Sequence, residues 1–129
     1  MRKASILILM TLIYASAIGQ FNFNAIYQSE EVNGETSYLR IYSDGVILIA
    51  DSDESKEEVE KWFSRDNQSA DTTKFITAKS NIKNNSRAVF SISENGLKYN
   101  YTAIIAGSTL TLTSVGNREK RMLQYSIKQ

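Results

Sequence analysis

The sequence predicts an all-β fold: an eight-stranded antiparallel up-and-down meander that closes into a barrel, with one short helix between strands three and four. Two observations predict this fold. Turn signals that contain glycine recur, several of them 9 to 11 residues apart, as they do in antiparallel all-β domains. Between the turns, apolar and polar side chains alternate, so that each strand has one buried and one solvated face.

The chain begins with the layout of a secretory signal peptide over residues 1–19. Arg2 and Lys3 give a positive start, an apolar run follows over residues 4–14, and small residues end the segment. The apolar run is shorter than the roughly 20 residues that a membrane-spanning helix needs. We therefore expect export, with the product periplasmic or extracellular.

Two cleavage sites fit the small residues at the end of this leader, after Ala17 and after Gly19. We favour the second and expect residues 20–129 to form a single domain. The sequence contains no cysteine, so neither a lipid-modified cysteine nor a disulfide is expected to hold the product. We expect a soluble protein without a stable membrane anchor, whose stability comes from an ordinary hydrophobic core.

The first three strands are expected at residues 21–29, 36–43 and 46–51. The second and third strands are joined by Asp44-Gly45, a dipeptide typical of a tight hairpin turn because both positions tolerate a positive φ. These strands should therefore pair as neighbours in the sheet.

The segment 55–64 departs from the alternating pattern and predicts the helix. Ser55 with Glu58 three residues later forms a capping box, in which each side chain accepts from the backbone N–H of the other residue. Glu57 and Lys61 are spaced to form an ion pair on one helix face.

One apolar stripe runs along this helix and must pack against another element. It consists of Val59, Trp62 and Phe63. We expect the helix to cover one open end of the barrel as a lid. Trp62 then either lines a binding site or belongs to the core, as a single tryptophan on such a stripe commonly does.

The second half of the chain supplies five further strands with short connections. Thr109 to Thr113 shows the pattern well, because leucine alternates with β-branched threonine. The five strands are expected at residues 72–79, 86–93, 97–105, 109–115 and 121–128.

The composition argues against several classes of function. The sequence contains no histidine and no cysteine, which removes Ser-His-Asp catalysis and the usual zinc sites. The acidic cluster Asp51–Glu54 lacks the glycine and glutamate spacing of a helix-loop-helix calcium site. Without the leader, 13 basic residues stand against 14 acidic ones, a net of −1 that does not attract nucleic acid. We expect no enzyme, no catalytic residue, no metal and no cofactor.

Three parts of the sequence carry a resemblance to a known group of proteins. They are the hairpin Tyr38–Val46, the helix end Lys61-Trp62-Phe63 and the late meander Tyr99–Thr113. In these parts the chain resembles the small exported lipocalin-like proteins of bacteria, within the calycin type of barrel. The Gly-x-Trp motif of true lipocalins is absent from the first strand. The resemblance implies a barrel fold, and many members of the group have no assigned activity.

A first hypothesis is a binding protein that holds a small apolar ligand in the barrel. Tyr38, Arg40 and Tyr42 share one face of their strand, and Trp62 of the helix is the fourth candidate. If that face points into the barrel, the arginine can hold a carboxylate. In the alternative, Leu39 and Ile41 point inward and Arg40 is solvated.

A second hypothesis is a packed barrel that acts on a protein partner through its outer surface, for example as an inhibitor. Five large aromatic residues are expected on inner faces and together would fill a short barrel. They are Phe75, Phe90, Tyr99, Tyr101 and Tyr125. A cavity larger than roughly 300 Å³ would distinguish the two hypotheses in favour of the first.

Overall fold

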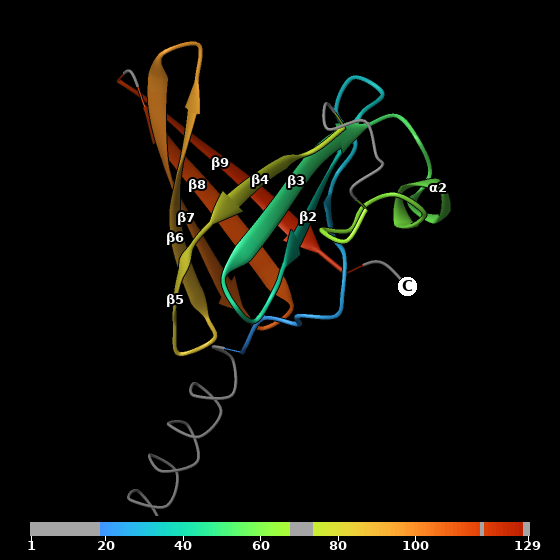
Figure 1. Ribbon diagram of the computed structural model, residues 1–129, viewed down its shortest axis with the longest axis horizontal. Coiled ribbons are helices and arrows are strands. Elements are labelled where there is room, and N and C mark those ends of the chain that lie inside the picture. The colour runs from blue at the N-terminus through green and yellow to red at the C-terminus, as the bar shows by residue number, and fades with distance from the viewer. Residues whose placement is uncertain (1–18, 68–73, 117, 128–129) are drawn as a thin grey trace, which may run out of the picture.

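The fold is a nearly closed antiparallel barrel, which confirms the predicted class (Figure 1). The computed structural model describes residues 19–67, 74–116 and 118–127, so residues 1–18 of the expected leader lie outside the described part. Within these described residues, nine strands form one sheet in the order β4-β3-β2-β1-β9-β8-β7-β6-β5. They are β1 (Tyr27–Ser29), β2 (Thr36–Ile41), β3 (Val46–Ser52), β4 (Ile76–Lys79), β5 (Asn81–Lys83), β6 (Arg87–Glu94), β7 (Leu97–Ala106), β8 (Thr109–Gly116) and β9 (Glu119–Ser126).

The sheet curls into a barrel, and its two edges are β4 and β5. The first and last strands pair directly, with Gln28 opposite Ser126, as a meander that curls on itself requires. Between these two edges the chain bends at Ser80, so that β4 pairs with β3 while β5 pairs with β6. The short β5 is the strand that the sequence did not predict, and it continues the expected fourth strand beyond the bend.

The bend is held by the turn between β2 and β3. The backbone N–H and the hydroxyl of Ser80 both donate to the carbonyl oxygen of Gly45, at 2.8 and 2.7 Å. Gly45 has a φ of 99°, and a Cβ there would lie 2.5 Å from the carbonyl oxygen of Ser80. Only glycine fits this contact without strain.

The helix α2 (Lys56–Glu60) starts where expected but ends earlier than residue 64. Ser55 caps it, because its hydroxyl accepts from the backbone N–H of Glu58 at 3.3 Å. The Glu58 carboxylate binds Lys61 at 3.0 Å, so the lysine pairs with Glu58 and not with Glu57. After Glu60 the backbone N–H groups of Lys61 and Trp62 donate to carbonyl groups three residues earlier, so the chain forms a tighter turn and the α-helix ends.

The expectation of a lid was wrong, because α2 lies against the outer wall of the barrel beside β2 and β3 (Figure 1). Val59 and Phe63 are completely buried there. The outward faces of β2 and β3 are themselves apolar and provide the surface against which the helix stripe packs. This outer cluster contains Ile26, Tyr38, Leu48, Ala50, Val59 and Phe63, with Tyr42, Val46, Trp62 and Phe75 at its margin. In the described part of the chain, no helix is long and apolar enough to span a bilayer.

The second apolar cluster fills the half of the barrel interior that lies towards the turn between β2 and β3. It contains Phe21, Tyr27, Leu39, Ile41, Ile47, Ala88, Phe90, Ala103, Ile105, Leu110, Leu112 and Tyr125. Phe21 closes this end of the barrel, since it is 5% exposed and its backbone N–H donates to the Asn85 carbonyl at 2.7 Å. Of the aromatic residues expected inside, Phe90 and Tyr125 are in this cluster and Tyr101 packs against it, whereas Phe75 lies in the outer cluster.

Candidate functional site

The opposite end of the barrel contains a pocket of about 460 Å³. Residues of seven strands line it, from β2, β3, β4 and β6 to β9. Its lower part is apolar and is formed by Ile49, Ile92 and Leu112. We call this hollow the mouth pocket.

Two tyrosines form part of the lower wall of the mouth pocket. The hydroxyls of Tyr125 and Ser37 share a hydrogen bond of 2.7 Å. Burial raises the pKa of Tyr125 to about 12. Tyr101 stacks on Phe90 with ring centroids 5.0 Å apart, and burial, followed by the nearby Glu94, raises its pKa. Both hydroxyls therefore stay protonated at neutral pH and are neutral hydrogen-bonding groups of the wall.

Charged side chains line the upper part of the same pocket. Asp51 ends the inward face of β3, Glu94 ends that of β6, and Arg121 lies near the start of β9. The Arg121 guanidinium forms an exposed ion pair with Glu119 at 3.3 Å. The pocket therefore has an apolar base and a charged rim, an arrangement suited to a molecule with a polar group at one end.

The predicted ligand residues of β2 do not line the barrel interior, so that part of the first hypothesis was wrong. Leu39 and Ile41 point inward, and Tyr38, Arg40 and Tyr42 lie on the outer face towards α2. Their orientation follows from the helix, which covers this outer face. The alternative was confirmed in that Leu39 and Ile41 point inward, and it was wrong in that Arg40 is half-buried and not solvated.

Arg40 and Tyr38 instead hold the segments around the helix. The half-buried guanidinium of Arg40 donates to the carbonyl oxygen of Phe63 at 3.0 Å. The Tyr38 hydroxyl donates to the carbonyl oxygen of Glu54 at 3.1 Å. These bonds satisfy the carbonyl groups at both ends of the helical segment, which is a structural role.

Trp62 also lies outside the mouth pocket. Its ring stacks on Phe75 at a centroid distance of 6.4 Å, and its Nε1 donates to the Glu54 carboxylate at 2.7 Å. The ammonium group of Lys74 lies 5.0 Å from the same ring. A smaller hollow beside it, of about 260 Å³, is open and mostly acidic.

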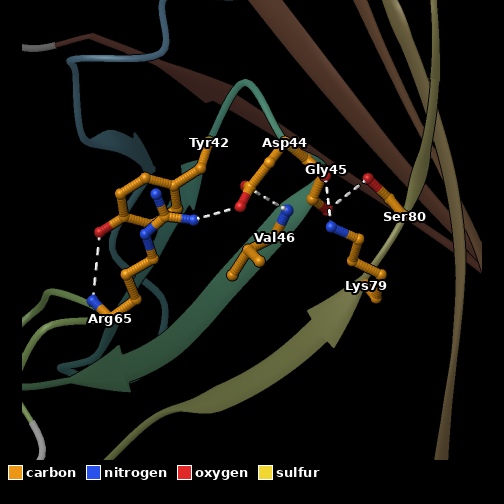
Figure 2. Close-up of polar contacts among 7 residues, drawn as sticks. All are labelled: Tyr42, Asp44, Gly45, Val46, Arg65, Lys79 and Ser80. Carbon is orange, nitrogen blue, oxygen red and sulfur yellow. Dashed lines mark hydrogen bonds and ion pairs between the residues drawn. The ribbon is translucent and has the colours of Figure 1, made fainter.

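Figure 2 shows a polar cluster that fixes the segment after α2 to the turn between β2 and β3. Arg65 binds the Asp44 carboxylate at 2.6 Å, and its guanidinium lies 4.3 Å from the centre of the Tyr42 ring. Lys79 donates to the backbone carbonyl of Asp44. The hydrogen bond from Arg65 lowers the pKa of Asp44. Every group in this cluster has a partner, and we interpret it as structural.

The sequence contains a signal for the mouth pocket that alternation alone does not reveal. Along four inward rows, apolar residues give way to a polar one at the same end of the barrel. The rows are Ile47-Ile49-Asp51, Phe90-Ile92-Glu94, Leu110-Leu112-Ser114 and, in reverse, Tyr125-Leu123-Arg121. Once the strands are in register, these ends meet and mark where the core stops.

Comparison of the chain with models of protein families, with curated proteins and with solved structures gives no significant match. Among the described residues, no group of acidic side chains is arranged to hold a metal ion.

Proposed function

We propose that this chain is an exported lipocalin-like protein that binds a small, largely apolar ligand in the mouth pocket. In this proposal residues 1–19 are a signal peptide and residues 20–129 are the binding domain. The observation that supports it best is a pocket of about 460 Å³ with an apolar base inside a barrel. Ligand pockets typically span about 300–1,000 Å³ and combine apolar walls with a few polar groups.

The lower half of the barrel gives the pocket a firm base. Leu112 lines the base of the pocket, Phe90 is buried in the core next to it, and Phe21 closes the far end of the barrel. A ligand that enters the mouth would thus meet a packed apolar surface and lose its hydration there, which favours binding by about 25 cal/mol for each Å² of apolar area buried.

Binding also fits the chemistry of the chain better than catalysis does. The sequence lacks histidine and cysteine, the commonest general base and the most reactive nucleophile. Within the described residues, the groups of the mouth pocket whose pKa is shifted are tyrosines whose burial keeps them protonated. We therefore propose a binding protein and not an enzyme.

The test uses N-phenyl-1-naphthylamine, a neutral apolar probe whose fluorescence rises in an apolar site. Ser114 lines the mouth pocket, and its neighbour Thr113 faces outward on the same strand. Ser114→Phe fills the pocket and should weaken probe binding about tenfold or more, whereas Thr113→Phe should leave it unchanged. Circular dichroism establishes that both variants are folded.

If the wild-type protein does not bind the probe, or if both variants bind it equally well, the proposal is wrong. The second hypothesis, a barrel that recognises a protein partner through its outer surface, would then gain support. Native mass spectrometry of protein purified from the exporting host provides an independent check, because a binding protein should retain some ligand of the cell.

A further inference from the structure

We propose that the mouth pocket prefers an amphiphile whose polar end is a protonated amine; this inference rests on the proposed function. Asp51 and Glu94 both line the pocket. Neither carboxylate has a hydrogen bond or an ion pair with any residue that the structure describes. Two carboxylates without partners above an apolar base are complementary to a cation that carries an apolar chain.

The lining of the mouth pocket holds one positive group, Arg121, against these two carboxylates, which leaves a net charge of −1. The guanidinium of Arg121 is already paired with Glu119 at 3.3 Å, and the ammonium group of Lys74 lies over the ring of Trp62. A further acid, Glu35, lines an adjoining hollow of about 270 Å³ that shares Asp51 with the mouth pocket. The side of the mouth formed by β2 and β3 is therefore negative.

The depth of the pocket sets the size of the apolar part. Asp51 lies two residues above Ile49 along β3, and Glu94 lies two residues above Ile92 along β6. Two residues of a strand span about 7 Å, so an amine at the level of the carboxylates places the first 7 Å of its chain against the apolar base. A chain of about six carbons or a single aromatic ring with a short linker suits this depth, and the octyl compounds, which are slightly longer, are convenient probes.

The experiment measures displacement of N-phenyl-1-naphthylamine by octylamine, octanol and octanoate at neutral pH. These three compounds share one chain and differ in the charge of the head. We expect octylamine to bind about tenfold more tightly than octanol, and octanoate to bind most weakly, because two exposed carboxylates each add a modest attraction. Raising the salt concentration from about 20 mM to about 500 mM should weaken the binding of octylamine and leave the binding of octanol unchanged.

Charge-removing variants locate the effect. Asp51→Asn and Glu94→Gln should each reduce the affinity for octylamine about threefold and leave the affinity for octanol unchanged. Glu57→Gln is the matched control, since it removes one exposed acid from the helix on the outer wall and should change neither affinity. The salt experiment uses the wild-type protein, so it still tests the proposal if a substitution impairs folding.

The outcomes separate this inference from the proposed function. Equal affinities for octanol and octylamine, or tightest binding of octanoate, would overturn the amine preference and leave the binding function intact. If none of the three compounds displaces the probe, and the probe itself does not bind, both proposals fail together.

Discussion

Replacing Tyr125 with phenylalanine tests whether the hydrogen bond beneath the mouth pocket stabilises the barrel. Tyr125 is 2% exposed, and its hydroxyl is 2.7 Å from that of Ser37. The substitution removes the hydrogen bond and leaves the serine without this partner, which costs about 1–2 kcal/mol of unfolding free energy. Removing both hydroxyls, in Ser37→Ala with Tyr125→Phe, should cost less than the two single changes combined, by about 1 kcal/mol.

The alkaline pH dependence gives a second measure of the same group. Burial raises the pKa of Tyr125 to about 12, from an ordinary value of 10.0. The unfolded chain therefore loses the tyrosine proton first, so this contribution is complete below pH 10 and is lost as the pH rises towards 12. The loss amounts to about 2 kcal/mol by pH 12, and the Tyr125→Phe variant lacks it.

Urea unfolding of the wild-type protein, the two single variants and the double variant, each at pH 7 and across pH 9–12, measures both effects. Tyr38 and Tyr101 have pKa values shifted in the same direction, so the wild-type and Tyr125→Phe curves should both fall, the wild-type curve more steeply. Parallel curves, together with no coupling in the double variant, would refute the account.

Three further outcomes follow from the structure. Phe21→Ala should lower the unfolding free energy by about 3 kcal/mol, measured by urea denaturation, because it empties the closed end of the barrel; a loss below about 1 kcal/mol would contradict that role. Ser55→Ala should lower the melting temperature by about 4 °C through loss of the helix cap, and an unchanged value would mean that the cap is dispensable. Asp44→Asn should make the unfolding free energy less sensitive to acid below pH 4, because the lowered pKa of Asp44 gives a stabilisation that is lost as the pH falls. If the unfolding free energy of the variant falls with acid as steeply as that of the wild type, the Arg65 contact does not stabilise the protein.

The strand pattern was predictable because alternation is a local property of the sequence. Eight of the nine strands fall on segments that the alternation and the glycine turns indicate. β5 was not predictable in this way, since the chain continues from β4 with only Ser80 between them. The bend that makes two strands is fixed by hydrogen bonds from Ser80 to Gly45, which is 35 residues away in the sequence.

The orientation of β2 shows a second limit of periodicity. Both faces of the segment 38–42 are apolar: Leu39 and Ile41 on one, Tyr38 and Tyr42 on the other. Alternation shows which residues share a face and leaves open which face enters the barrel. The orientation depends on long-range partners, because only the outer face has a helix to cover it. For this reason Arg40 was a reasonable candidate for the lumen and lies outside it.

The ends of the inward rows explain why the mouth of the barrel stays open. The carboxylates of Asp51 and Glu94 would pay a large desolvation penalty if the apolar core extended to their level, and the described residues offer neither of them a cationic partner. The packed core therefore stops below them, near Leu112, and the strands above cannot collapse onto one another. In the proposed binding function, a ligand with an apolar end and a cationic end would replace water at the base and leave both carboxylates solvated or paired.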